Sequence, residues 1–239
     1  MQTSHSFNNE NWWVVPISRS ANAFSDEFNR SLANIILEKE REILAKGTST
    51  RVAGLDDGLT AHWMEYNVLN WDFDECRQLA EVVVAGFEAF LDAAGLKGKP
   101  GMEIAGISCW ANILRPGQAL QVHHHDPAFA SAHYTVTTGL DEGVELEAAD
   151  SGETIYFRPG FSDRSHGGKQ NGFVSPWDDD WRLCRKPTAG YLTFFPSYIR
   201  HEVRPNVGRT ERISIALDIF TKSQEAMIYF GGPRWYVPK

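Results

Sequence analysis

The stretch RISIALDI at residues 212–219 decides the fold, because its large aliphatic residues occupy every second position. Alternate side chains of a β-strand point to opposite faces of the sheet. One face of this strand then carries Ile213, Ile215, Leu217 and Ile219. The other face carries Arg212, Ser214, Ala216 and Asp218. We expect helices to bury the apolar face, and we expect the polar face to look into a cavity, where a buried Arg needs a carboxylate partner.

Further short runs of β-branched and aromatic residues occupy the second half of the chain. They span residues 104–114, 131–137, 144–148, 154–157, 191–195 and 212–220. Turn signals separate them, such as Arg-Pro-Gly at 115–117 and Pro-Asn-Val-Gly at 205–208. Many short strands at this spacing predict a β-sandwich or a small barrel.

The first half of the chain has a helical pattern. From Ser25 to Gly47, and again from Asp72 or Asp74 to Gly95, apolar residues form one stripe at helical spacing. Neither helix covers its own stripe, so we predict a single domain over residues 1–239. It comprises a mostly helical supporting region (1–102), a β core (103–221) and a C-terminal extension (222–239). The fold class is α+β, mainly β.

Composition argues against several classes of protein. The 239 residues carry a net charge of −8, which disfavours nucleic acid and anionic membranes as partners. The three cysteines (Cys76, Cys109 and Cys184) form no CxxC pair, which argues against a disulfide framework and a structural zinc site. The first ten residues lack the order of a signal peptide, and no apolar run is long enough for a bilayer. We therefore expect a cytoplasmic protein without a membrane partner.

Four of the eight histidines fall within eleven positions: His123, His124, His125 and His133. In a strand, His123 and His125 share one face, while His124 shares the other with Asp126. Either pair needs one more ligand to form a three-ligand facial site with open positions, as in non-haem Fe(II) oxygenases. The alternative is that the cluster is a solvated surface feature.

A distant histidine can supply the third ligand. His201 follows an apolar segment that ends in Phe-Pro-Ser at 195–197, and ten residues separate it from Arg212. These ten residues leave room for a short strand and a turn that leads back into the strand starting at Arg212. Arg212 can bind a carboxylate through two nitrogens, and the Ser214 hydroxyl can donate to the same group.

This ordered set resembles the 2-oxoglutarate/Fe(II) oxygenase superfamily, and most closely its group with a His-x-His, His and Arg-x-Ser pattern. The matching stretches span about residues 104–220 and are Cys109-Trp-Ala-Asn112, Pro116-Gly117, 123–125, Ala130-Ser-Ala-His-Tyr134, Phe157-Arg-Pro159, Phe195-Pro-Ser197, His201 and Arg212-Ile-Ser-Ile215. The resemblance implies a double-stranded β-helix (jelly-roll, cupin-like) core backed by helices.

The resemblance also implies a site and a reaction. Fe(II) would bind His123, His125 and His201, and the distal carboxylate of 2-oxoglutarate would pair with Arg212 and Ser214. Oxidative decarboxylation to succinate and CO2 would hydroxylate or demethylate an unknown substrate, either a small molecule or a peptide.

Most of the superfamily has His-x-Asp or His-x-Glu where this chain has His123 and His125. The pair His124 and Asp126 with His201 would restore the carboxylate, but it needs a one-residue slip in register. In the favoured assignment Asp126 would orient a histidine instead of binding iron. Tyr134 and Asn112 lie on strands that could line the cavity and contact 2-oxoglutarate. Of His133 and Tyr134 at most one can face the iron, and we expect His133 to be structural.

Two other interpretations stay open. A cupin-type metalloenzyme fits Gly117 and the His-x-His pair, although positions 129 and 130, where a glutamate is expected, are Phe and Ala. A catalytically silent barrel could instead serve as a binding module. The glycine-rich stretch at 160–180 could act as a lid.

Overall fold

The computed structural model describes residues 15–20, 24–46, 58–140, 151–159, 182–227 and 233–238. Its helices are α1 (Asp26–Ala45), α2 (Asp74–Ala93) and the 3-10 turns η1 (Leu59–His62), η2 (Val68–Asn70) and η4 (Lys222–Met227). Its strands are β1 (Ser18–Ser20), β2 (Ile104–Leu114), β3 (Leu120–His123), β4 (Ala130–Thr135), β5 (Thr154–Phe157), β6 (Arg182–Arg185), β7 (Leu192–Pro196), β8 (His201–Val203), β9 (Arg212–Thr221) and β10 (Trp235–Tyr236).

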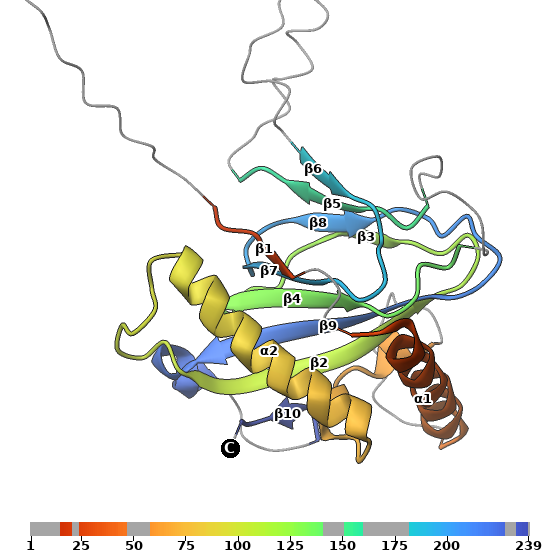
Figure 1. Ribbon diagram of the computed structural model, residues 1–239, viewed down its shortest axis with the longest axis horizontal. Helices are drawn as coiled ribbons and strands as arrows, with labels where there is room; N and C mark the ends of the chain where they lie inside the picture. Colours follow the sequence, from red (N-terminus) through yellow and green to blue (C-terminus); the bar gives the residue numbers. More distant parts are fainter. Residues whose placement is uncertain are drawn as a thin grey trace, which may run out of the picture.

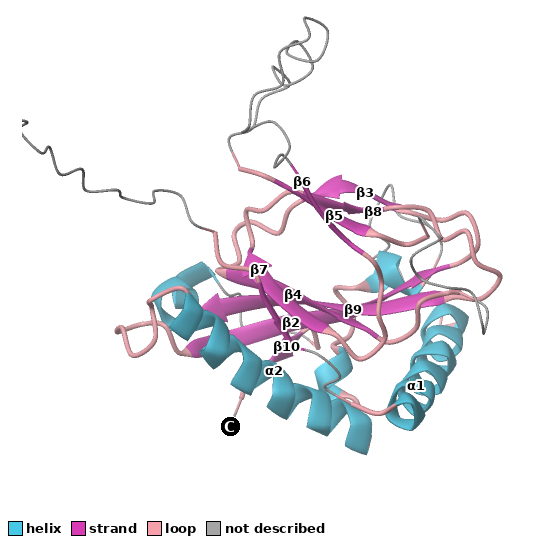
Figure 2. Ribbon diagram, turned by 45° about the horizontal axis from the view of Figure 1, so that its top comes forward, coloured by secondary structure: helices cyan, strands magenta, loops and turns pink. Residues whose placement is uncertain are grey.

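The strands form two stacked antiparallel sheets (Figure 1). The six-stranded sheet has the order β1-β7-β4-β9-β2-β10, and the four-stranded sheet has the order β3-β8-β5-β6. Figure 2 shows both long helices on the outer side of the larger sheet, with the smaller sheet on its other side. This layering confirms the double-stranded β-helix backed by helices that the family resemblance implies.

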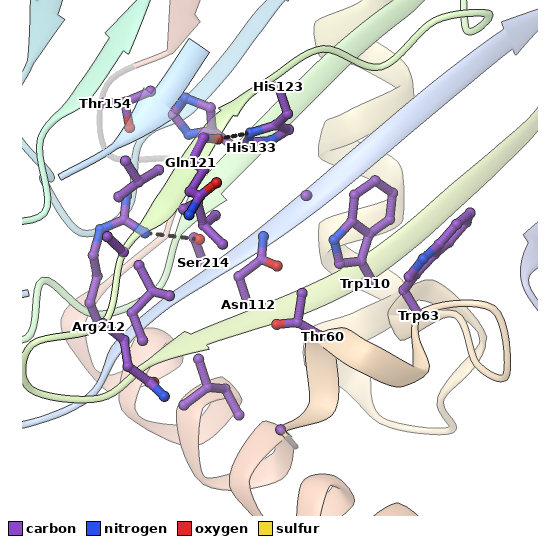
Figure 3. Close-up of a pocket in the computed structure, with 18 of the residues that line it drawn as sticks. Thr60, Trp63, Trp110, Asn112, Gln121, His123, His133, Thr154, Arg212 and Ser214 are labelled. Carbon is purple, nitrogen blue, oxygen red and sulfur yellow. Dashed lines mark hydrogen bonds between the residues drawn. The ribbon is translucent and has the colours of Figure 1, made fainter. Parts of the chain in front are cut away.

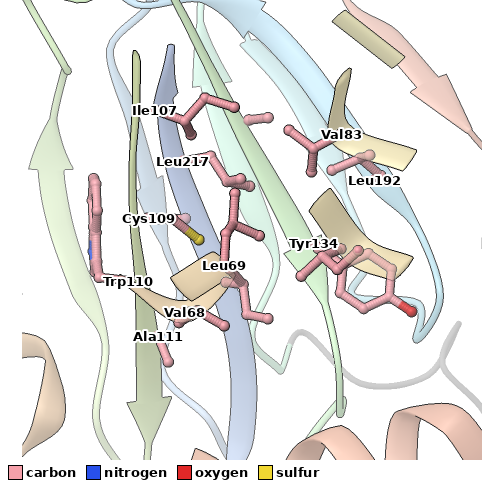
Figure 4. Close-up of a cluster of buried hydrophobic side chains, with 14 of the residues drawn as sticks. Val68, Leu69, Val83, Ile107, Cys109, Trp110, Ala111, Tyr134, Leu192 and Leu217 are labelled. Atoms are coloured by element: carbon pink, nitrogen blue, oxygen red, sulfur yellow. The ribbon is translucent and has the colours of Figure 1, made fainter. Parts of the chain in front are cut away.

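The hydrophobic core lies between the helices and the six-stranded sheet (Figure 4). The alternation of β9 is confirmed: its four apolar residues, from Ile213 to Ile219, are all buried in this cluster. Helix α1 begins where predicted, because the Ser25 hydroxyl accepts a hydrogen bond of 3.2 Å from the Phe28 amide. Helix α2 begins at Asp74 and presents Leu79, Val83 and Phe87 to the sheet.

Most predicted strands lie where expected. β2 and β5 have the predicted bounds, and β4, β7 and β9 differ by one or two residues. The run at 144–148, the stop at Gly47 and the possible lid at 160–180 lie outside the described residues. The pattern did not predict β3, β6, β1 and β10, because each has only two to four residues, too few for a period to be recognised. None of the described helices is both long and apolar enough to cross a bilayer.

Candidate active site

A cavity of about 740 Å³ lies between the two sheets. Its walls come mainly from the polar face of β9 and from β2, β3, β4 and β8, with α1 and η1 at one end. Figure 3 shows Arg212 and Ser214 on one side of this space, Asn112 in the middle, and Trp110 and Trp63 on the other side. The cavity therefore has a cationic end and an aromatic end.

Three histidines meet at this cavity. His123 ends β3 and lies directly opposite His201, the first residue of β8, while His125 follows two residues after His123. One ligating nitrogen from each ring lies within 4.8 Å of the others. These nitrogens come close enough together to share one metal ion.

The hydrogen bonds of the three rings leave the same nitrogen free in each. The Nδ1 atoms of His123 and His201 lie 2.6 and 3.0 Å from the carbonyl oxygens of Gln121 and Ile199. The Nδ1 atom of His125 lies 3.0 Å from a carboxylate oxygen of Asp218. Because these partners accept hydrogen bonds, we assign the proton of each neutral ring to Nδ1 and the lone pair to Nε2.

The free nitrogens suit a transition-metal cation. The Nε2 atoms of His125 and His201 lie 3.3 Å apart, so their lone pairs repel each other unless a cation or a proton lies between them. Burial is the main cause that lowers the pKa of His123 and of His201, which keeps both rings in the neutral form that binds metal. The donor set therefore fits Fe(II), whose protein ligands include imidazole.

The alternative ligand pair lies elsewhere. The side chains of His124 and Asp126 are about half exposed, and His124 Nδ1 lies 3.4 Å from Asp126 Oδ2. Asp126 also accepts a hydrogen bond of 3.3 Å from the Ser197 hydroxyl. The structure does not bring this pair together with His201. Asp126 therefore lies beside a histidine, as expected, but this histidine is His124, and the carboxylate next to His125 of the triad is that of Asp218.

Arg212 is a buried cation that faces the same cavity, with 1% of its surface exposed. Its Nε donates to the Gly152 carbonyl oxygen at 3.1 Å, and its Nη1 donates to the Ser214 hydroxyl at 3.1 Å. Burial lowers its pKa to about 10, so it stays charged at neutral pH. No carboxylate of the described residues lies within 4 Å of it, so the guanidinium is available to an anionic ligand.

Asn112 and His133 line the cavity near Arg212. The Oδ1 of Asn112 is buried and has no hydrogen-bond donor among the described residues, which leaves it available to a ligand. His133 contacts the Tyr156 hydroxyl through Nε2, and burial lowers its pKa to about 3, so it is neutral. His133, not Tyr134, is thus the cavity-facing member of this pair.

The expectation that Tyr134 could contact 2-oxoglutarate is wrong. Tyr134 is fully buried on the opposite face of β4, in the core beneath the helices (Figure 4). Its hydroxyl donates to the Oδ1 of Asn29 on α1. Alternation along β4 turns Tyr134 toward the helices when His133 faces the cavity.

An aromatic wall, formed by Trp63 and Trp110, borders the histidines. The two ring centroids lie 5.4 Å apart, and the Trp110 centroid lies 5.7 Å from that of His125. The Arg234 guanidinium lies 5.4 Å from the Trp63 ring centroid. No pattern in the sequence places Trp63 at the cavity, because this residue, which directly follows η1, reaches the cavity only through tertiary folding.

Comparisons with known proteins agree with this geometry. Residues 108–218 match a family model described as "Putative 2OG-Fe(II) oxygenase". The matched range holds all three histidines, Arg212 and Ser214. No curated protein sequence matches this chain.

Several solved structures share the fold at low sequence identity. A prolyl-4-hydroxylase from Pseudomonas putida is 19% identical, with a TM-score of 0.50, covering 85% of this chain and 86% of that chain. A Trichoplax adhaerens prolyl hydroxylase, solved in complex with a hypoxia inducible factor oxygen degradation domain peptide fragment, is 13% identical, with a TM-score of 0.52 and coverages of 88% and 86%. AviO1 from Streptomyces viridochromogenes Tue57 is 11% identical, with a TM-score of 0.52 and coverages of 85% and 89%.

Proposed function

We propose that this chain is a 2-oxoglutarate/Fe(II)-dependent oxygenase, the family whose model matches residues 108–218, and that it hydroxylates an apolar C–H bond and releases succinate and CO2. One observation carries the proposal. A buried Arg212 without a carboxylate partner in the described residues faces the same cavity as three histidines with free Nε2 atoms. Such a cavity suits a ligand with one end on a metal and an anionic group at the other end.

Each residue has a specific task in this proposal. His123, His125 and His201 hold Fe(II), while Arg212 and Ser214 hold the distal carboxylate of 2-oxoglutarate through charge-assisted hydrogen bonds. The Asn112 Oδ1, which lacks a donor among the described residues, accepts a hydrogen bond from a water molecule in the cavity. When bound, iron and 2-oxoglutarate together supply the activation of dioxygen. The chain itself fixes the tautomers, orients the diacid and excludes bulk water from the space between the sheets.

We assign the substrate to the aromatic wall, because Trp110 adjoins His125 on the side away from Arg212. Indole rings favour an apolar ring or aliphatic group of a peptide or small molecule. We propose hydroxylation over demethylation of a methylammonium group, because the Arg234 cation over Trp63 would repel a second cation there. The peptide in the Trichoplax adhaerens structure supports a peptide as the first substrate class to screen.

Anaerobic titration of the Fe(II)-loaded protein with 2-oxoglutarate tests this function, with succinate release in air as a second readout. We expect binding by the wild-type chain, at least tenfold weaker binding by Arg212→Leu, and no metal-dependent turnover by His201→Ala. A cupin-type enzyme that does not use 2-oxoglutarate would bind iron and ignore the diacid. A silent barrel would bind neither, and either result would refute the proposal.

A further inference from the structure

Asp218 lies on the cavity face of β9, directly behind one of the three histidines. Its Oδ1 lies 3.0 Å from His125 Nδ1 and accepts a hydrogen bond of 2.8 Å from the Ser131 hydroxyl. β9 is bounded on both sides in the six-stranded sheet, and Asp218 is paired in register with Ser131 on β4 and with Ser108 on β2. Only 14% of its side chain is exposed. The carboxylate therefore occupies a fixed position next to the histidine cluster.

We propose that Asp218 is a positioning residue of the metal centre and supplies the negative charge that this chain lacks among its ligands. It holds His125 in the tautomer whose Nε2 faces the cavity. It also places a carboxylate one hydrogen bond behind the His125 ring. Most of the superfamily has a carboxylate ligand at the position that His125 occupies in this chain. The inference rests on the proposed function, since it assumes that the three histidines bind a divalent metal.

The charge of the site gives the physical reason. Three neutral imidazoles leave the full charge of a divalent cation uncompensated, whereas a carboxylate ligand removes one unit. A carboxylate that accepts the outer N–H of a ligating histidine makes the ring a stronger donor, and its loss typically weakens metal binding by about 10- to 100-fold. Because Asp218 is mostly withdrawn from solvent, water screens its charge less than that of a surface carboxylate.

The other charged residues near the histidines, Asp126 and Arg234, do not take over the role of Asp218. Asp126 is the nearest carboxylate along the sequence, but it is about half exposed and lies beside His124, outside the triad. Arg234 is close enough for Asp218 to raise its pKa, against the stronger lowering by burial. The Arg234 charge therefore reduces the field of Asp218 at the metal without removing the hydrogen bond to His125.

Three variants test the inference through metal affinity, with no catalytic turnover required. Both contacts of Asp218 end on Oδ1, so the amide of Asp218→Asn can preserve them while the charge is lost. We expect Asp218→Asn to bind Fe(II) or Co(II) about tenfold more weakly than the wild-type chain in anaerobic calorimetry. Asp218→Ala loses both charge and hydrogen bond, so it should bind at least as weakly. The matched control Asp126→Asn removes the same charge outside the triad and should stay within about twofold of wild type.

Specific outcomes would overturn the inference. Asp218→Asn within twofold of wild type, or an equal loss in Asp126→Asn, would show that the carboxylate behind His125 has no particular role. If Asp218→Asn does not fold, Ser131→Ala takes its place: it removes the hydroxyl that anchors Asp218 and should lower affinity severalfold, and unchanged affinity would contradict the inference. A wild-type chain that binds no metal would refute the proposed function itself, a result distinct from a wild-type chain whose variants bind equally well.

Discussion

Substitution of Gly152 by Ala should weaken 2-oxoglutarate binding, although Gly152 is not a proposed ligand. Gly152 precedes β5 and has a φ of +61°, and its carbonyl oxygen accepts the hydrogen bond from Arg212 Nε. A Cβ added there would lie 2.7 Å from Arg212 Cδ and 2.9 Å from its Nε. Arg212 is fully buried, so its side chain cannot swing into solvent to relieve the overlap.

The expected magnitude follows from this overlap. The new methyl group falls short of an ordinary carbon–carbon separation by roughly 0.8 Å, so the guanidinium must shift by a comparable distance. Such a shift spoils hydrogen-bond geometry, and a hydrogen bond to a charged group contributes about 1.5–3 kcal/mol. We therefore expect the Kd for 2-oxoglutarate to rise roughly tenfold to a hundredfold. The left-handed backbone adds about 1–2 kcal/mol of general destabilisation.

A matched variant separates the two effects. Gly98 has a φ of +74° and nothing within 4 Å of an added Cβ, so Gly98→Ala carries the backbone strain without touching the cavity. Anaerobic calorimetry on both metal-loaded variants should show the 2-oxoglutarate defect in Gly152→Ala alone, with metal affinity retained in both. A Kd for Gly152→Ala within twofold of the control would refute the assignment of Arg212 as the anion-binding group.

Three further substitutions test other parts of the structure. The pKa of His133 is about 3 in the folded chain and near 6.5 in the unfolded chain, so the unfolded state binds a proton first on acidification. Between pH 6.5 and 4, the free energy of urea unfolding should therefore fall by about 1.4 kcal/mol per pH unit more in wild type than in His133→Gln. Equal slopes of unfolding free energy against pH would contradict the burial of a neutral ring. Tyr134→Phe should lose about 1 kcal/mol of stability with its hydrogen bond to Asn29 and keep the 2-oxoglutarate affinity of wild type, whereas a weaker affinity would return Tyr134 to the cavity. Gly86→Ala places a Cβ 2.6 Å from Phe194 and should lower stability by roughly 1–3 kcal/mol in thermal unfolding without changing metal affinity; no loss would mean that α2 packs less closely on β7.

The sequence predicts the fold well where one face of an element is apolar and the other polar. β9 carries large aliphatic residues at every second position from Ile213 to Ile219, so its alternation correctly separates the buried face from the face with Arg212 and Ser214. β3 has only four residues, Leu-Gln-Val-His, and their alternation is too short to distinguish a strand from a turn. Its register is instead determined by pairing with β8, which places His123 opposite His201.

The other residues that line the cavity were harder to predict than the proposed metal-binding histidines. Alternation alone says that His133 and Tyr134 face opposite sides, but not which side is the cavity; the packing of β4 beside β9 decides it. Asp218 was placed on the cavity face, yet its contact with His125 depends on how the chain turns after β3. Trp63 directly follows η1 and lies about fifty residues before the end of β2, the first strand that lines the cavity. No local sequence pattern encodes a contact between residues so far apart in the chain.

Strand β9 carries both the residue of the proposed anion-binding end, Arg212, and the residue that supports the proposed metal end, Asp218. Arg212 and Asp218 lie on the same face of β9 and are six residues apart, which corresponds to about 20 Å along the strand. Arg212 marks the anion-binding end, and Asp218 supports His125 at the metal end. Because the side-chain period is two, a one-residue slip of β9 would turn both residues into the apolar core and expose Ile213 to the cavity. The cost of burying a cation and a carboxylate there keeps the strand in register, so the same alternation that makes the sheet stable also positions the metal and the diacid relative to each other.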